Sequence, residues 1–166
     1  MAIRKIRELN DEILRKRSKE VEIVDDKIKE LIKDMEDTLN EYDGIGLAAV
    51  QVGVLKRVVI VKLPDEIETI KLINPKIVEK KGIQTVEEGC LSIPNHYAQV
   101  ERPAELILEA LDENGKNIKI DAKGILSVVL CHETDHLDGE LFIDKMIPGT
   151  LEVVTADDIN KEKNKK

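Results

Sequence analysis

The pattern with the clearest chemistry is a pentapeptide in which two histidines enclose a glutamate, His132-Glu133-Thr134-Asp135-His136. On an α-helix, residues i and i+4 fall about 40° apart on one face, so both imidazoles can bind one cation. The glutamate beside the first histidine can then act as a general base toward water on that cation. A solvated helix end with two chance histidines is the competing interpretation. Because the pattern ends the most apolar segment of the chain, where such side chains are costly without a purpose, a metal site is favoured.

A catalytic metal of this kind needs a third protein ligand and an open position for water. The candidates are Cys90, Cys131, His96 and several carboxylates. Cys131 directly precedes His132 and lies about 100° further round the helix, which favours packing over ligation. Cys90 lies in a segment, residues 87–94, where a glycine and a proline can leave backbone N–H groups free to face a substrate. A buried structural thiol is the alternative for Cys90.

Residues 44–51, Gly-Ile-Gly-Leu-Ala-Ala-Val-Gln, form a third segment of interest. Its two glycines allow the backbone to approach a ligand closely. Gln51 offers an amide donor of the type found in oxyanion holes. The G-x-G start is not a dinucleotide-binding fingerprint, because no strand precedes it and the third glycine has the wrong spacing. Alone, this segment is weak evidence.

Two helices are predicted to frame these residues. Apolar residues at spacings of three and four predict a helix over about residues 25–42, with Asp25 or Asp26 as its N-cap and Asp43-Gly44 at its end. Residues 123–137 are apolar almost all round, which predicts a central helix that carries the metal pattern. Residues 150–161 predict a last amphipathic helical segment before a charged tail.

Several extended segments accompany the helices. Residues 57–63 predict a buried strand, residues 71–79 an extended piece interrupted by Asn74-Pro75, and residues 44–54 a tightly held irregular backbone. Residues 105–112 and 117–122 alternate apolar and polar side chains around Asn114-Gly115, which predicts a hairpin with a type I′ turn. There is no βαβ rhythm. We therefore expect an α+β fold, with antiparallel strands wrapped around a central metal-binding helix and with N- and C-terminal helices.

Composition limits the function classes. The chain has 166 residues, enough for one domain, and a formal net charge of −8. Phe142, Tyr42 and Tyr97 are the only aromatics, which argues against a stacking platform, and no stable nucleic-acid complex is expected. No apolar run reaches the roughly 18 residues of a membrane span. The charged N-terminus lacks the apolar region of a signal peptide and the two cysteines are expected to be reduced, so we expect a cytoplasmic protein.

Three motifs together resemble those of peptide deformylase. They are G-x-G-L-A-A-x-Q at residues 44–51, E-G-C-L-S at residues 88–92 and H-E-x-D-H at residues 132–136. Asn74-Pro75, Arg102 and the run at residues 137–144 support the match, which covers about residues 13–144. Three motifs in this order are far more specific than the pentapeptide alone.

The resemblance implies a metallohydrolase that removes the N-formyl group from the initiator methionine of new polypeptides and releases formate. Its metal would be held by Cys90, His132 and His136, with water in the fourth position. Such a ligand set accepts zinc, nickel, cobalt or ferrous iron, and raw affinity favours zinc over iron. The family resemblance nevertheless implies Fe2+ as the physiological ion.

The same resemblance implies roles for the remaining site residues. Glu133 would move protons, while the Gln51 amide and the Leu91 backbone N–H would stabilise the developing oxyanion. Backbone around Ile45 and Gly46 would pair with the substrate. Glu88 and Arg102 would pair to brace the cysteine loop. The methionine side chain would enter an apolar pocket formed by Val86, Ile125, Val128 and Val129.

Other functions and partners stay open. An endopeptidase could share the histidines and glutamate, although such enzymes usually take their third ligand downstream of the helix. A non-catalytic, metal-stabilised binding protein is a second alternative. The sequence Asn95-His96-Tyr97 departs from the common family pattern and affects the expected groove rim, with His96 expected as rim or loop surface. We expect a catalytic domain at residues 1–150, a C-terminal segment with a charged tail at residues 151–166, and a monomer. The tail is most simply a solvated end, and contact of the C-terminal segment with the ribosome is the sharper alternative.

Overall fold

The protein, seen here in a computed structural model, is described at residues 2–158 and at residue 161. Its helical elements are the short 3₁₀ helices η1 (Glu12–Arg15) and η2 (Ala49–Val52) and the α-helices α1 (Asp26–Glu41), α2 (Ile125–Leu137) and α3 (Phe142–Lys145). Its strands are β1 (Gly46–Ala48), β2 (Val58–Val61), β3 (Ile70–Lys81), β4 (Gln84–Cys90), β5 (Ile93–Arg102), β6 (Glu105–Leu111), β7 (Asn117–Lys123) and β8 (Glu152–Val153). The predicted α+β class is confirmed.

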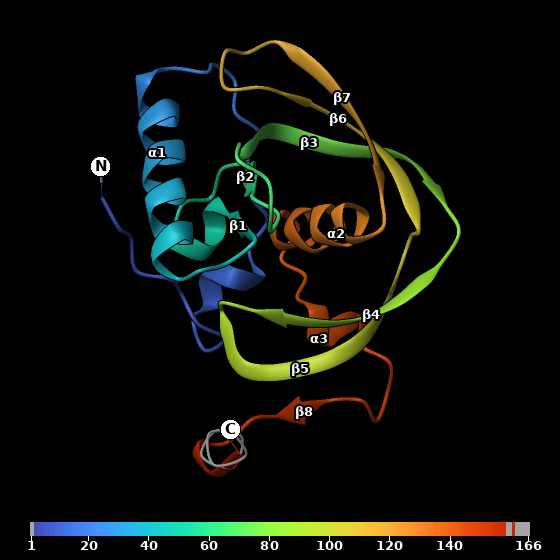
Figure 1. The fold of residues 1–166 in the computed structure, drawn as a ribbon. Coiled ribbons are helices and arrows are strands. Elements are labelled where there is room, and N and C mark those ends of the chain that lie inside the picture. The colour runs from blue at the N-terminus through green and yellow to red at the C-terminus, as the bar shows by residue number, and fades with distance from the viewer. Residues whose placement is uncertain (1, 159–160, 162–166) are drawn as a thin grey trace.

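Two antiparallel sheets enclose the central helix. The larger sheet has the strand order β1-β2-β3-β6-β7, and the smaller has the order β4-β5-β8. Figure 1 shows α2 between them, with β3, β6 and β7 on one side and β4 and β5 on the other. No helix in the described part of the chain is long and apolar enough to cross a membrane.

Burial on every side explains why α2 is the most apolar segment. Ten of its 13 residues are buried, as expected for a helix wrapped by the rest of a fold. Arg57 fixes its C-terminal end, where Nη1 donates to the Leu137 carbonyl at 3.1 Å and to Asp138 Oδ1 at 2.9 Å. A cation is favourable at this end of the helix dipole. These contacts fix the end of α2 that carries His132 and His136.

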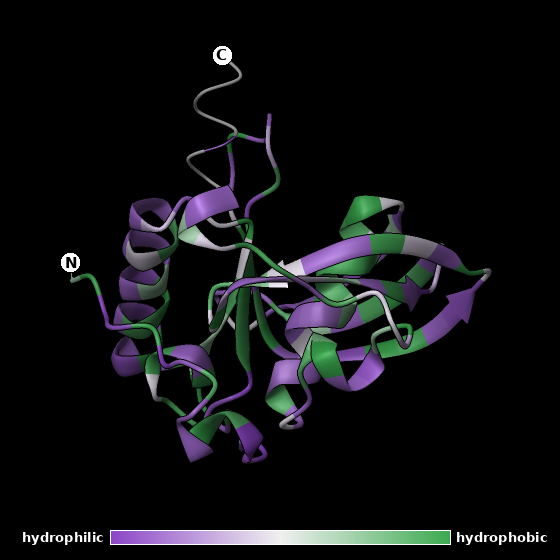
Figure 2. Cartoon of the chain, turned by 90° about the horizontal axis from the view of Figure 1, so that it is seen from below, coloured by the Kyte–Doolittle hydropathy of each residue, from purple (hydrophilic) through white to green (hydrophobic). Residues whose placement is uncertain are grey.

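The first long helix agrees with its sequence pattern. Asp25 is the N-cap, and its Oδ1 accepts the Ile28 N–H at 3.0 Å. The apolar face of α1 joins a core cluster with residues of β1 and β2, including Leu47 and Val58. Figure 2 shows hydrophilic residues along much of the outer side of α1, and mostly hydrophobic strands through the middle of the molecule.

The predicted hairpin is present as β6 and β7, but its predicted turn type is wrong. A type I′ turn needs positive φ at both central residues. Gly115 has φ 79°, whereas Asn114 is not among the described non-glycine residues with positive φ. Asp112 explains the difference, because its Oδ1 accepts the N–H groups of Asn114 and Lys116 at 2.8 and 2.9 Å. The loop is therefore wider, with glycine alone in the left-handed region.

Three further segments differ from expectation. Residues 44–54 were expected to be irregular, yet β1 pairs with β2 before η2 begins. β3 continues through Asn74-Pro75 by means of a bulge, with Asn74 at φ 52°. The amphipathic segment expected from residue 150 begins as a strand, because β8 pairs with β5 at residues 96 and 97. Residues 156–158 are helical, and the charged tail at 162–166 lies outside the described residues.

Candidate metal centre and active site

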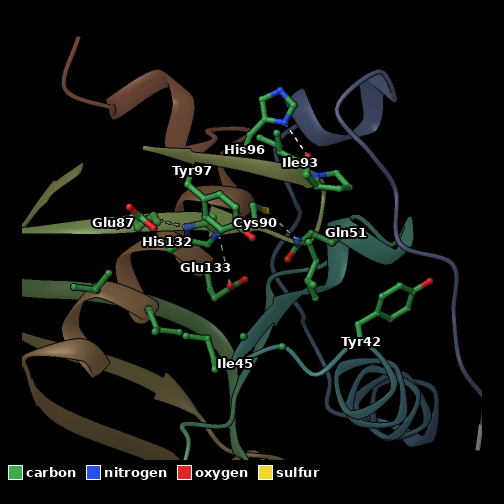
Figure 3. Close-up of a pocket in the computed structure, with 18 of the residues that line it drawn as sticks. Tyr42, Ile45, Gln51, Glu87, Cys90, Ile93, His96, Tyr97, His132 and Glu133 are labelled. Atoms are coloured by element: carbon green, nitrogen blue, oxygen red, sulfur yellow. Dashed lines mark hydrogen bonds and ion pairs between the residues drawn. The ribbon is translucent and has the colours of Figure 1, made fainter. Parts of the chain in front are cut away.

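One cavity of about 810 Å³ brings together almost all of the residues singled out from the sequence. It lies beside α2, between β1 and the hairpin of β4 and β5 (Figure 3). Every predicted site residue except His136 lines it: Ile45, Gly46, Gln51, Val86, Cys90, Leu91, Ile125, Val128, Val129, His132 and Glu133. His136 does not line the cavity, and it is only 1% exposed.

Cys90, His132 and His136 form a group whose ligand atoms all lie within 4.8 Å of one another. The two histidine Nε2 atoms are 3.3 Å apart, and Cys90 Sγ is 3.4 Å from His136 Nε2. Ligands at zinc-like bond lengths of about 2.0 to 2.3 Å from one tetrahedral centre lie roughly 3.3 to 3.6 Å apart. The donor set and its spacing therefore fit a single divalent cation.

His132 is held in the tautomer that metal binding requires. Its Nδ1 lies 2.7 Å from Glu88 Oε1, and because a carboxylate only accepts, Nδ1 carries a hydrogen, which leaves Nε2 as the nitrogen that can bind a metal. Arg102 in turn donates two hydrogen bonds to the Glu88 carboxylate, from Nε at 2.6 Å and from Nη2 at 2.9 Å. Its remaining nitrogen, Nη1, donates to Asp135 Oδ2 at 2.7 Å. The expected Glu88–Arg102 pair is thus present.

Burial and charge shift the titration of these groups. Burial raises the pKa of Glu88, but hydrogen bonds from Arg102 and His132 outweigh it and lower the value to about 2. Burial opposes charge on His132, yet its hydrogen bonds to Cys90 and Glu88 raise its pKa well above the usual value. Burial, with the charge of His132 next, lowers the pKa of His136. The Glu88 carboxylate is therefore ionised over the range in which His132 must hold its orientation.

Glu133 has the properties of a proton acceptor beside the metal group. Its side chain is buried, and Oε2 has no hydrogen-bond partner among the described residues. Burial raises its pKa to about 7, with the charge on His132 opposing the rise. Gly46 makes room for it, because a Cβ atom there would lie 2.7 Å from Glu133 Oε1. A side chain at position 46 would displace the carboxylate.

Two candidate oxyanion donors line the same cavity as Glu133. Gln51 is in η2, and its Nε2 lies 3.5 Å from Cys90 Sγ (Figure 3). Leu91 and Ser92 form the turn between β4 and β5, so the Leu91 N–H lies outside the ladder that joins those strands. Both donors border the metal group.

The apolar side of the cavity comes from β4 and α2. Val128 and Val129 are buried, whereas Ile125 is 55% exposed and lies at the mouth. Together with Val86 of β4 they form an aliphatic surface that can receive a linear thioether side chain. Cys131 is in the core and His96 is outside the metal group, as expected.

Sequence reasoning missed several lining residues. Ile6 and Glu8 come from the N-terminal segment, Tyr42 follows α1, and Glu87 lies on β4. No local pattern marks the first two. Tyr97 lines the cavity at the expected rim, and its ring packs against Gly89, where a Cβ would lie 2.7 Å from it.

Comparisons with known proteins agree with this geometry. The family model described as polypeptide deformylase matches residues 3–151. The chain belongs to the peptide deformylase family. It is therefore a hydrolase that removes the N-formyl group from newly made peptides, and the metal dependence of the family is matched by the Cys/His/His group.

Relatives and solved structures cover most of the chain. The peptide deformylase of Acetivibrio thermocellus is 54% identical over 147 residues, which span 89% of this chain and 85% of that protein. A crystal structure from Legionella pneumophila has a TM-score of 0.85 and 44% identity, covering 89% of this chain and 88% of that one. The Synechococcus elongatus structure, a complex with actinonin, has a TM-score of 0.82 and 38% identity and covers 97% and 84%.

Proposed function

We propose that this chain deformylates formyl-methionyl peptides with a divalent cation held by Cys90, His132 and His136 and with Glu133 as the proton-transfer group. The observation that supports this most is the grouping of the three ligand atoms within 4.8 Å beside Glu133, whose Oε2 has no hydrogen-bond partner among the described residues. Such a cation, when bound, lowers the pKa of water so that hydroxide can attack a carbonyl near neutral pH.

In this proposal Glu133 accepts the proton of the attacking water and passes it to the departing amine. Its pKa of about 7 suits a group that must both accept and release a proton at neutral pH. Gln51 Nε2 and the Leu91 N–H donate to the formyl oxygen as it gains charge. Release of the amine then leaves formate and a free N-terminus.

Substrate binding would use both walls of the cavity. Backbone at Ile45 and Gly46 pairs with the extended peptide, since β1 ends the larger sheet and has a free edge there. The methionine side chain occupies the pocket formed by Val86, Ile125, Val128 and Val129. His96 and Tyr97 also line the cavity, so we expect the later residues of the peptide at that rim.

The ligand set can be tested by the absorption of the cobalt-loaded protein. A cobalt–thiolate bond gives a charge-transfer band, and Cys90→Ala should abolish it and lower cobalt affinity. Cys131→Ala is the matched control, because that thiol packs in the core and should leave the band intact. A band that survives Cys90→Ala would exclude Cys90 as a ligand.

We propose Fe2+ as the physiological ion. Thiolate and imidazole donors accept iron as well as zinc, so the assignment rests on the family resemblance and not on ligand softness. Anaerobic protein loaded with iron should turn over a formyl-methionyl peptide faster than the zinc form, and should lose activity in air as the site oxidises. Equal rates for the two forms, measured by formate release, would contradict this assignment.

The remaining partner assignments are also proposals. A cytoplasmic monomer is consistent with substrates that are nascent peptides. Contact with the ribosome is assigned to the segment from residue 151, whose described residues 151–153 and 155–158 are exposed. The division into a catalytic domain at residues 1–150 and this segment stays a prediction.

A further inference from the structure

The amide of Gln51 is held at both ends. Its Oε1 accepts the Ala48 N–H at 2.9 Å, and because a backbone N–H only donates, this end of the amide is the oxygen. Nε2 then lies 3.1 Å from Ser92 Oγ and 3.5 Å from Cys90 Sγ. An amide nitrogen has two hydrogens. One is donated to Ser92 Oγ, and the other faces Cys90 Sγ, one of the three grouped ligand atoms (Figure 3).

Ser92 therefore fixes the nitrogen end of this amide, as the Ala48 N–H fixes its oxygen end. It is fully buried at 0% exposed, next to Leu91 in the turn between β4 and β5. The Gln51 and Ser92 side chains meet although they are 41 positions apart in the sequence. The contact thus joins the turn that carries one proposed oxyanion donor, Leu91, to the helix that carries the other.

The N-terminal segment ties the same two places together through its backbone. The Arg7 N–H donates to the Gln51 carbonyl at 2.7 Å, and the Leu9 N–H donates to the Ser92 carbonyl at 2.9 Å. Ile6 anchors this stretch, because its side chain is 6% exposed and packs in the core cluster of α1 and β1. Residues 6–9, here called the N-terminal brace, thus bridge η2 and the β4–β5 turn (Figure 1).

We propose that Ser92 is a positioning residue for the Gln51 amide, and that the N-terminal brace holds the two backbones that bring them together. The inference rests on the proposed role of Gln51 as an oxyanion donor. Such donors stabilise a transition state strongly only when they are already aimed at the developing charge. A rotated amide should therefore lower kcat while leaving KM and the metal group nearly unchanged.

The direct test is a double-mutant cycle on the metal-loaded full chain. Gln51→Ala should lower kcat by about a hundredfold, the size reported for loss of one oxyanion donor. Ser92→Ala should lower kcat by roughly tenfold, with metal content and KM within about twofold of the wild type. If Ser92 acts through Gln51, the double variant should be no slower than Gln51→Ala alone.

The brace has its own variant and a matched control within one segment. Ile6→Ala should lower kcat by roughly threefold to tenfold in the wild type and should have no further effect in Gln51→Ala. Ile6→Val should restore most of the loss. Ile3→Ala makes the same change at a side chain that is 56% exposed and should leave kcat unchanged. Ile6→Ala should also speed hydrogen exchange at residues 48–52.

The outcomes separate this inference from the proposed mechanism. Multiplicative losses in both cycles would overturn the positioning role of Ser92 and the brace while leaving Gln51 as a donor. An unchanged kcat in Gln51→Ala would remove the proposed role of Gln51 and this inference with it. Should Ser92→Ala fail to fold, the Gln51 side-chain amide of the wild type gives an independent measurement by ¹⁵N NMR. Protection of these hydrogens from exchange with solvent supports the proposal, and exchange as fast as that of a solvent-exposed glutamine side chain overturns it.

Discussion

Replacing Glu133 with glutamine should lower kcat/KM for a formyl-methionyl peptide by roughly 10²- to 10⁴-fold, the range for loss of a general acid–base. The amide has nearly the same shape, so it fits the space that Gly46 leaves beside it. It cannot accept a proton at neutral pH, however, and the attacking water then has no base. Metal content should stay at the wild-type level, because Glu133 is not one of the three grouped ligands.

The control for this variant is Glu101→Gln, the same chemical change at an exposed residue of β5 that does not line the cavity. Formate release and metal analysis on the same preparations give both readouts. A Glu133→Gln protein that keeps its metal and deformylates at the wild-type rate would refute the proton-transfer role.

Replacing Arg102 with methionine should lower the free energy of unfolding by about 3 to 5 kcal/mol, the range for breaking a buried ion pair from one side. Glu88 is 7% exposed, and its carboxylate would lose both hydrogen bonds from the guanidinium. Asp135 would lose its bond to Nη1 as well. Methionine fills much of the volume of the arginine stem, so the loss reports charge and hydrogen bonding more than packing.

The same substitution should weaken metal binding by roughly 10- to 100-fold, because Glu88 orients His132. Lys123→Met is the control, since that lysine pairs with Glu105 at 3.4 Å on an exposed surface and should change stability by less than about 1 kcal/mol. Urea unfolding of the metal-loaded variants measures their stability, and metal titration of the same variants measures their affinity. An Arg102→Met protein as stable as Lys123→Met would show that Glu88 does not depend on its partner.

The parts of the fold that the sequence predicted are those with a local signal. The helix at Asp26–Glu41 follows from apolar spacing and a capping aspartate, and α2 follows from its continuous apolar character. The β4–β5 hairpin was missed because β4, with Glu87, Glu88 and Gly89, is too polar to show strand alternation. The pairing of β5 with β4 and with β8 depends on the packing of the whole fold and not on a local sequence pattern.

The site divides in the same way. His132, Glu133 and His136 belong to a motif whose spacing carries chemical meaning, whereas Cys90 was one of several candidate ligands until the family resemblance singled it out. Ile6 and Glu8 line the cavity because backbone hydrogen bonds hold the N-terminal segment against η2 and the β4–β5 turn. No spacing within residues 2–9 encodes that path. The rim at His96 and Tyr97 likewise depends on contacts with β8.

The most direct test of the central claim is the amount of formate released from formyl-Met-Ala-Ser by anaerobic, metal-loaded protein, measured beside an unformylated internal peptide. We expect one formate for each free amino terminus that appears and no cleavage of the internal peptide. Hydrolysis of the internal peptide without formate release would instead identify an endopeptidase and contradict this account.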